Sequence, residues 1–393
     1  MFLLQKLIAI LLLIHSYLLI SPFVHAYVPI SLISLSLSLL IIVSLIYLRC
    51  STRIRKSLFL ITLFILCPFV ISAIYWESFV LSIYPKFLIF SIITVWMLEA
   101  RTHLYFIKYS TVFLFFQCIL AIIGFVYAAF GGQPILDVTI GWGRTFSFYL
   151  TSFSVTNYVG FIRPSGLFDE PGALSFFTCF VAVLREIYHQ NRKYTILLLT
   201  LGFITLSLAH AIFVFLYLFH VSIITKRWKV LIIFVTSTIF TLLILNSFLE
   251  KNYLIDYAIS RATSDVEGGR GALMVNAYEI IRSGDWLSFV FGVDSNCLTD
   301  YIDNCRYIYP AMGENYLSLI AFAGVGPSWI YYFYTFLIII LLFVKPRVAF
   351  PLFALSVLFW QRPVIFMIGY SIVFAYLIFE VAKLFKKGEG NAI

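Results

Sequence analysis

The sequence predicts an all-α polytopic membrane protein, and three observations lead to that fold class. Hydrophobic residues make up 62% of the 393-residue chain, whereas charged residues make up only 11%. The mean hydropathy is +1.01. Apolar runs long enough to cross a bilayer recur from end to end. Because backbone groups in lipid must be hydrogen-bonded internally, we expect helical spans and a single integral membrane domain over residues 1–393.

The apolar runs predict about twelve spans, with the first one kept as a span rather than removed as a signal peptide. The second-last run is short, and the run before it is long enough to break at Gly324, Gly326 and Pro327. The polar break at Ala209 and His210 separates two further spans. The predicted spans lie near residues 2–20, 27–48, 58–75, 79–99, 104–130, 172–188, 194–208, 211–225, 229–249, 314–344, 348–361 and 363–382.

Basic residues orient these spans. Most of the 27 Lys and Arg residues form short clusters that fall on one side of the arrangement. The positive-inside rule assigns that side, and with it both termini, to the cytoplasm. The long hydrophilic stretches 131–171 and 250–313 are then extracytoplasmic loops. Because the net charge of +9 is spread among the short clusters between spans, nucleic acid is not an expected partner.

The first loop ends in RPSGLFDEPG, residues 163–172, a charged run before a predicted span. Gly166 permits a tight turn, and Pro171 suits the first position of a helix. Asp169 and Glu170 fit two roles, because acids there complement a helix amino terminus and can also act in chemistry. Arg163 is a candidate for phosphate oxygens, which its guanidinium can bind in a bidentate manner, with lipid headgroups as the alternative.

The second loop contains EGGRGAL, where glycines flank Arg270 just before a predicted amphipathic helix over residues 271–283. Close backbone approach and a helix amino terminus suit an anion site, and a solvated turn is the alternative. Cys297 and Cys305 lie eight residues apart in a loop assigned to an oxidising compartment, so we expect a disulfide between them.

A third group, GENYL, opens the long span that begins near residue 314. Glu314 fits either a helix cap or a general base, and Asn315 follows it directly. His210 faces the same predicted side, where a structural role is the alternative. The histidines show no metal-ligand spacing, so neither a metal nor another cofactor is expected. No nucleophile elbow, phosphate loop or dinucleotide fingerprint is present in the sequence.

Taken in order, these groups resemble the O-antigen polymerase and ligase superfamily over roughly residues 160–345. Its first-loop pattern of arginine, glycine, aromatic residue and helix-starting proline is matched by Arg163, Gly166, Phe168 and Pro171. The further matches are an arginine after glycine at Arg270, the Phe291-Gly292-Val293 element, and a helix start containing Asn315 and Leu317.

Two positions depart from the superfamily pattern. Ala209-His210-Ala211 stands where members often carry a serine–arginine pair. Glu314 stands where ligases have a histidine, which favours a polymerase over a ligase. A flippase or transporter of lipid-linked glycan is the alternative from another class, although it would be expected to have related halves and polar groups near the midplane.

The resemblance implies a lipid-dependent glycosyltransferase of the GT-C-like type in the bacterial inner membrane. It implies transfer of a growing glycan from undecaprenyl pyrophosphate to a hydroxyl of a second lipid-linked repeat unit, with membrane lipid and a chain-length regulator as partners. Arg163 and Arg270 would bind the pyrophosphate. The substrate site would also include Gly166, Asn315 and His210, and the base would be Glu314, Glu170 or Asp169.

Overall fold

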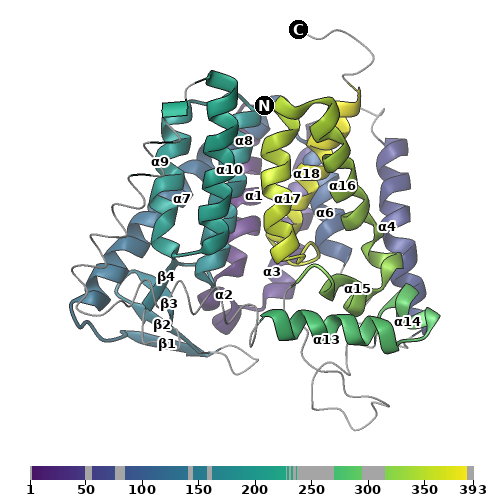
Figure 1. Cartoon of the computed structure of the whole chain (residues 1–393), viewed down its shortest axis with the longest axis horizontal. Coiled ribbons are helices and arrows are strands. Elements are labelled where there is room, and N and C mark those ends of the chain that lie inside the picture. Colours follow the sequence, from purple (N-terminus) through teal and green to yellow (C-terminus); the bar gives the residue numbers. More distant parts are fainter. Residues whose placement is uncertain are drawn as a thin grey trace. The chain divides into compact units, whose positions relative to one another are not determined.

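The computed structural model describes residues 2–48, 55–75, 85–139, 145–156, 162–226, 270–293 and 315–386, together with residues 228, 229, 232 and 236. The chain forms two compact units that alternate along the sequence. Unit 1 comprises residues 1–60, 86–214 and 366–393, and unit 2 comprises residues 61–85 and 215–365. The described structure is 79% helical, as the sequence predicts (Figure 1).

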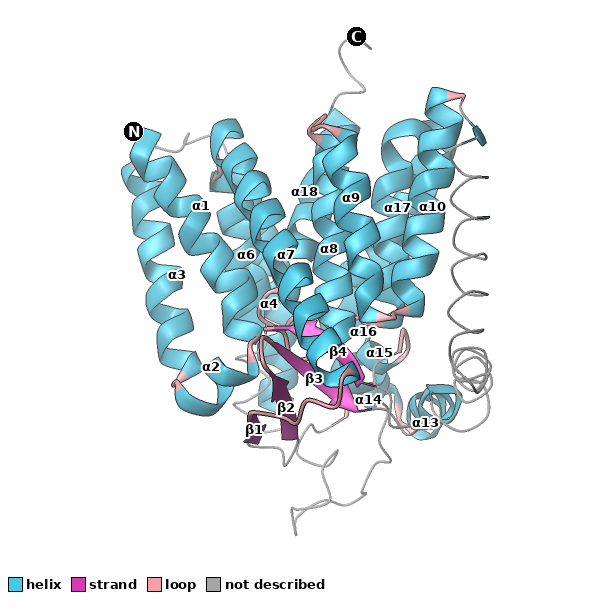
Figure 2. Cartoon of the chain, turned by 90° about the vertical axis from the view of Figure 1, so that its left-hand side faces the viewer, coloured by secondary structure: helices cyan, strands magenta, loops and turns pink. Residues whose placement is uncertain are grey.

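Unit 1 is a bundle of long helices with a small sheet at one end (Figure 2). Helix α7 has 30 residues and is therefore about 45 Å long, which exceeds the roughly 30 Å of a bilayer core. The helices are α1 (Phe2–Tyr17), α2 (Pro22–Tyr27), α3 (Ile30–Tyr47), α6 (Pro85–Met97), α7 (Ala100–Ala129), α8 (Pro171–Ile187), α9 (Arg192–Gly202) and α18 (Tyr370–Lys386). The 3-10 turns η1 (Leu18–Ile20) and η3 (Phe203–Thr205) follow α1 and α9.

Within the predicted extracytoplasmic loop 131–171 the chain forms a small sheet, which the prediction of an all-α fold did not include. Its four strands, β1 (Leu136–Thr139), β2 (Thr145–Tyr149), β3 (Ser152–Thr156) and β4 (Ile162–Gly166), are antiparallel in the order β1-β2-β3-β4. Val138, Phe146 and Phe153 form a buried cluster, and Phe23 of α2 packs against it. The strands are stable because one apolar face is covered, which an isolated ribbon this short would lack.

The sheet is attached to the last turns of α7. A Cβ at Gly124 would lie 2.7 Å from Ser152 Cβ and 2.8 Å from Tyr149 O, so only glycine allows this approach. Thr151 Oγ1 donates to Leu120 O at 2.7 Å, which ties the β2–β3 turn to the same helix. The end of α7 thereby fixes the sheet and the segment that follows it.

The opposite end of unit 1 carries basic residues. The start of α1 meets the start of α7, where the Phe2 and Tyr105 rings are 5.6 Å apart. The ends of α8 and α18 meet there too, because Tyr188 OH donates to Glu380 Oε1 at 2.9 Å. The basic residues on these helix ends and the α8–α9 turn are Lys6, Arg101, Arg192, Lys193 and Lys383. Predicted cytoplasmic and predicted external segments thus occupy opposite ends of unit 1, and which end faces the cytoplasm stays a prediction.

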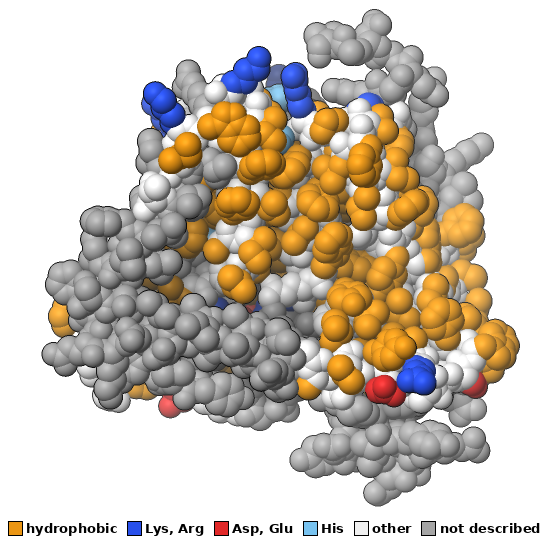
Figure 3. Space-filling view, viewed as in Figure 1, with side chains coloured by type: hydrophobic (Ala, Val, Ile, Leu, Met, Phe, Trp, Pro, Cys, Tyr) orange, Lys and Arg blue, Asp and Glu red, His pale blue; other side chains and the backbone are white. Residues whose placement is uncertain are grey.

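Unit 2 contains α13 (Arg270–Ser283), α14 (Trp286–Phe291), α15 (Ser318–Ala323), α16 (Val325–Val344) and α17 (Pro346–Gln361). The helices α4 (Arg55–Tyr75) and α10 (Leu208–Thr225) contain residues of both units, and α6 has its first residue, Pro85, in unit 2. The predicted amphipathic helix over residues 271–283 is confirmed as α13. The predicted break in the run 314–344 falls between α15 and α16, at Gly324. The φ of Gly324 is +73°. On the face drawn in Figure 3, hydrophobic side chains cover α16 and α17.

The helices overlap most of the predicted spans in the ranges that the structure describes, although several bounds differ. In those ranges four helices are long and apolar enough to cross a membrane: Phe2–Ile20, Ala100–Ala129, Leu208–Thr225 and Val325–Val344. Shorter apolar helices include Leu32–Tyr47, Thr62–Ser72 and Pro85–Met97. The predicted span 229–249 lies almost wholly outside the described residues. A membrane protein is therefore supported, and the count of twelve crossings stays a prediction.

One predicted boundary is wrong. The break expected at Ala209 and His210 lies instead at residues 203–207, and His210 is inside α10. The turn is made largely of apolar residues, and Leu206 takes a left-handed conformation with φ +49°. The polar partner of this turn, Arg163, comes from a distant strand, so the local sequence did not predict the turn.

Candidate functional site

The predicted site residues divide between the two units. Arg163, Gly166, Asp169, Glu170 and His210 belong to unit 1. Arg270, Glu314 and Asn315 belong to unit 2. The two sets are described separately.

In unit 1 the RPSGLFDEPG segment is fixed by a buried turn between β4 and α8. Ser165 Oγ lies 2.8 Å from Phe168 O and 3.1 Å from Phe153 O, either of which accepts its one hydrogen, and Phe168 N donates to Ser165 O at 3.1 Å. Phe168 is buried, and its ring lies 5.4 Å from Phe177 of α8 and 6.3 Å from Tyr17 of α1. The aromatic position of the motif therefore anchors the segment in the helix bundle.

Gly166 is required by the geometry of this turn. Its φ is +64°, and its N–H donates to Ser152 Oγ at 2.9 Å. The next amide, that of Leu167, donates to Gln117 Oε1 at 2.9 Å. A Cβ at Gly166 would lie 2.8 Å from the same Gln117 Oε1, so a larger residue would displace that side chain. These contacts explain the glycine by packing and backbone conformation.

Arg163 joins β4 to the turn before α10. Its side chain is buried. Nε and Nη2 donate to Thr205 O at 3.3 and 3.2 Å, and Nη2 donates to Leu206 O at 3.3 Å. These contacts hold the Arg163 guanidinium in one orientation where β4 meets the turn before α10.

His210 is buried one turn into α10, where it contacts α8 and α9. Nε2 donates to Leu199 O at 2.7 Å, so in the neutral ring Nδ1 is the acceptor and faces Cys179 Sγ at 3.5 Å. A Cβ at Gly202 would lie 2.4 Å from His210 Cε1. These contacts give His210 a packing role in positioning the same turn that Arg163 binds.

Asp169 and Glu170 lie at the start of α8, and both are partly exposed. The Glu170 carbonyl accepts the first helical bond, from Ala173 N at 3.0 Å, and Pro171 occupies the first position of the helix, as predicted. The Glu170 side chain makes no cap hydrogen bond. Glu170 therefore does not cap α8 through its side chain. Its position places the carboxylate beside the positive end of the helix dipole.

In unit 2 Asn315 connects the start of α15 to the first turn of α13. Oδ1 accepts from Leu317 N at 3.0 Å and from Ser318 N at 3.1 Å, which is the role of a capping side chain. Nδ2 donates to Leu273 O at 3.4 Å. Arg270, the first residue of α13, is one turn before Leu273, so Asn315 fixes the helix end that carries this arginine.

Three predicted residues lie outside the described residues, namely Glu314, Cys297 and Cys305. The predicted base and the predicted disulfide therefore stay predictions. For Arg270 the structure gives the place in α13 only.

Sequence reasoning missed three buried polar residues of unit 1. Gln117 supports the Gly166 turn by accepting from Leu167 N. The only sign of this role in the sequence is that Gln117 is a single amide side chain within an apolar run. Arg185 of α8 donates to Thr195 Oγ1, Thr111 Oγ1 and Asn191 O at 2.9, 3.1 and 2.9 Å, although its sequence position suggested a surface charge. Glu380 of α18 is buried and pairs with Lys383 at 3.0 Å, a spacing of three residues that the sequence shows.

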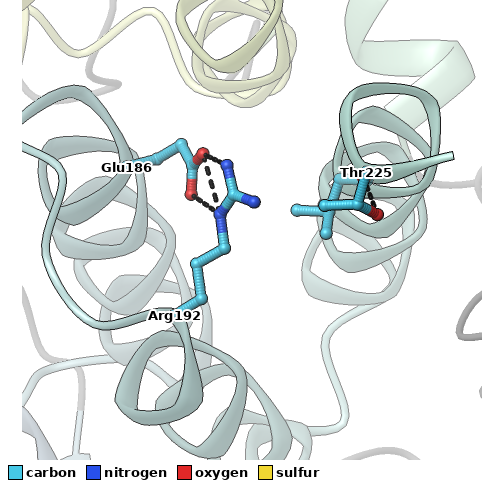
Figure 4. A network of polar contacts seen from close by, with 4 residues as sticks. Glu186, Arg192 and Thr225 are labelled. Carbon is cyan, nitrogen blue, oxygen red and sulfur yellow. Dashed lines mark hydrogen bonds and ion pairs between the residues drawn. The ribbon is translucent and has the colours of Figure 1, made fainter. Parts of the chain in front are cut away.

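Figure 4 shows the ion pair at the basic end of α8. Arg192 Nε lies 3.1 Å from both carboxylate oxygens of Glu186, and Arg192 Nη2 also bonds Oε1. The figure also draws Thr225, whose Oγ1 donates to Val221 O at 2.8 Å within α10. The Glu186–Arg192 pair closes the short α8–α9 turn, far along α8 from Glu170.

No protein-family model, curated protein or solved structure matches this chain. Across the described ranges, no group of three or more His, Cys, Asp and Glu side chains is placed to hold a metal ion. The unit 1 site thus offers an oriented guanidinium and two partly exposed carboxylates around one fixed turn. Such groups can stabilise a developing anion and accept a proton.

Proposed function

We propose that this chain is a polysaccharide polymerase that joins undecaprenyl-pyrophosphate-linked repeat units at the external face of a bacterial inner membrane. The observation that carries the proposal is the fixed turn of residues 163–170, which carries Arg163, Asp169 and Glu170 between β4 and α8 at the sheet end of an apolar helical unit. A site at the end of a helical bundle can act on the headgroup of a lipid whose tail stays in the bilayer. The order of motifs along the chain supports the same family.

In the proposed reaction, the acceptor hydroxyl oxygen bonds to the anomeric carbon of the donor glycan, and the bond from that carbon to the pyrophosphate oxygen breaks. The hydroxyl proton passes to a carboxylate, for which Glu170, Asp169 and Glu314 are the candidates. The pyrophosphate leaves on its lipid carrier with additional negative charge. Arg163 and Arg270 would stabilise that charge, and the fixed orientation of the Arg163 guanidinium supports this role.

The test uses carboxylate variants in a strain that lacks the native gene. Glu170→Gln and Asp169→Asn are compared with Glu186→Gln, which changes an acid at the other end of α8. We expect surface-glycan electrophoresis to show single repeat units without the long ladder for the variant of the true base. The control should keep the ladder. Glu314→Gln tests the third candidate in the same assay.

Two other patterns in the gene deletion would contradict the proposal. Loss of all attached glycan with polymer retained on its carrier would indicate a ligase. Repeat units trapped on the cytoplasmic leaflet would indicate a flippase or transporter.

The arginines are tested by Arg163→Lys and Arg270→Lys, because a point charge cannot replace a bidentate fork. Loss of one such contact in the transition state should lower the rate roughly thirty-fold to a thousand-fold, or about 2 to 4 kcal/mol. Arg163 also holds the turn before α10, so the thermal stability of its variant is measured in parallel. Full ladders from both variants at normal protein levels would rule out the arginine clamp.

A further inference from the structure

The segment from α13 to α14 exposes more large apolar side chains than a water-facing loop would. The exposed fractions are 71% for Trp286, 54% for Val275, 53% for Tyr278, 46% for Phe289 and 37% for Met274. Contiguous apolar surface of this kind marks a site that is covered by something other than water. Trp and Tyr are also the residues enriched where a bilayer meets water.

The opposite face of α13 is already used within unit 2. Ala277 and Ile280 are buried with Val293 and Ala321, and Ile281 packs against this cluster. The helix therefore has an inner apolar face that binds α15 and a second, outer apolar face. No described residue packs over this outer face, whose apolar side chains are exposed.

Three glycines attach this segment rigidly to the start of the α16 span. A Cβ at Gly292 would lie 2.2 Å from Phe322 O, one at Gly324 would lie 2.3 Å from Val290 O, and one at Gly326 would lie 2.9 Å from Val290 O. Val293 N donates to Ala321 O at 3.1 Å, and Ser72 Oγ of α4 donates to Phe291 O at 2.9 Å. The end of α14 is thus fixed at the level where α16 begins.

The surface of α16 beyond this junction has the character of a lipid-facing span. Val325–Val344 is long and apolar enough to cross a membrane, and Phe333, Phe336 and Phe343 on it are exposed. Helix α13 runs across the direction of α16 rather than along it (Figures 1 and 2). A helix that lies transverse to a span, at its end, has the orientation of an interfacial helix.

An interfacial helix places its charged side chains on the water side, away from the spans, and the α13–α14 segment does so. Its charged residues after Arg270 are Glu279, Arg282 and Asp285, and all three are exposed. Figure 3 shows the acidic and basic side chains of this region along its edge away from the spans, with hydrophobic side chains between them and α16. The Asp285 carboxylate accepts from Ser288 N at 2.7 Å, and this hydrogen bond lowers its pKa below the ordinary value.

We infer that the α13–α14 segment is an interfacial anchor whose outer aromatic face, Tyr278, Trp286 and Phe289, inserts into the boundary between lipid headgroups and acyl chains. Its partner is the bilayer itself, because the exposed face continues from the lipid-facing span to which the segment is fixed. The inference does not depend on the proposed polymerase activity. One consequence is that the first turn of α13, with Arg270, is held at the level of the lipid headgroups.

Photocrosslinking in native membranes tests the anchor on the full chain. p-Benzoylphenylalanine replaces Tyr278, Trp286 or Phe289, one position at a time, which exchanges one aromatic side chain for another. The same residue at Glu279 is the matched control on the charged edge of α13, and at Phe336 it is the positive control on α16. After irradiation, intact-mass and lipid analysis identify the adducts of each purified variant.

We expect severalfold more phospholipid adduct at the three aromatic positions than at Glu279, approaching the yield at Phe336. Protein adducts as the main product would overturn the inference and identify a protein partner. Equal lipid yield at Glu279 would overturn it too, because the segment would then have no water-facing edge. So would an absence of adducts at all three positions while Phe336 reacts. Equal extraction and thermal stability of the variants ensure that misfolding does not produce these results.

Discussion

At the scale of single residues, Gly166 occupies a position where a side chain meets two separate penalties. Its φ of +64° is strained for residues with a Cβ, and that Cβ would lie 2.8 Å from Gln117 Oε1 and 3.2 Å from Gln117 O. Gly131, at the end of α7, has a φ of +84° and nothing within 4 Å of an added Cβ. An alanine at Gly131 would therefore meet backbone strain alone, whereas an alanine at Gly166 would meet both backbone strain and a steric clash.

We predict that Gly131→Ala lowers the free energy of unfolding by about 1 kcal/mol, from left-handed strain alone. Gly166→Ala should lower it by roughly 1 to 3 kcal/mol more, because the Gln117 side chain must move. Thermal unfolding of the purified protein in detergent measures both effects. Equal losses from the two variants would mean that Gln117 yields without cost, and the buried turn would then not depend on this contact.

At the scale of the helical elements, buried arginine side chains join segments that are distant in sequence. Arg185 of α8 binds Thr111 of α7, Thr195 of α9 and the carbonyl of Asn191 between α8 and α9. Arg192 stands at the start of α9, and its salt bridge with Glu186 is 38% exposed on the arginine side. Arg185 and Arg192 lie on either side of the α8–α9 turn but differ in burial and in the geometry of their contacts.

We predict that Arg185→Lys lowers the free energy of unfolding by about 2 to 4 kcal/mol, because an ammonium group cannot reach three partners in three directions and leaves buried acceptors unpaired. Arg192→Lys should change it by about 0 to 1 kcal/mol, because the arginine side of this pair is partly exposed and a lysine keeps the charge. Thermal unfolding in detergent compares the variants. A loss from Arg192→Lys as large as that from Arg185→Lys would contradict the assignment of Arg185 as the main tie.

A helix or a break between helices could be predicted from the sequence only where the residues that cause it are adjacent in the chain. The α15–α16 break was predictable because Gly324, Gly326 and Pro327 interrupt an apolar run. Helix α13 was predictable from its own periodicity. The turn at residues 203–207 was not, since it is apolar and its polar partner, Arg163, comes from a distant strand.

The sheet was missed for a related reason. Its strands have only four or five residues each, and their Ser and Thr residues resemble a hydrophilic loop. They become strands because α2 covers their apolar face and α7 holds the β2–β3 turn, and no window of sequence contains these contacts. In the candidate site, the same limit hid the partners of Arg163 and Gly166, although the residues themselves were found from charge and turn chemistry.

At the scale of the whole molecule, the two ends of unit 1 differ in chemistry. One end carries Lys6, Arg192, Lys193 and Lys383, and the other carries the sheet and the 163–170 turn. Because positive residues are retained on the cytoplasmic side, this difference predicts that the sheet end faces outward. The proposed activity needs the same orientation, since repeat units are joined on the external face.

Single cysteines at exposed positions test that orientation. We predict that Thr139→Cys in β1 is labelled by a membrane-impermeant maleimide in intact spheroplasts, whereas Lys193→Cys in α9 is labelled only after the cells are broken. Both positions are exposed, so access depends on the side of the membrane. Peptide mass spectrometry reads each site separately from the six native cysteines. If Lys193→Cys reacts in intact spheroplasts and Thr139→Cys does not, the chain has the opposite orientation, and a 163–170 turn facing the cytoplasm could not join repeat units outside the cell.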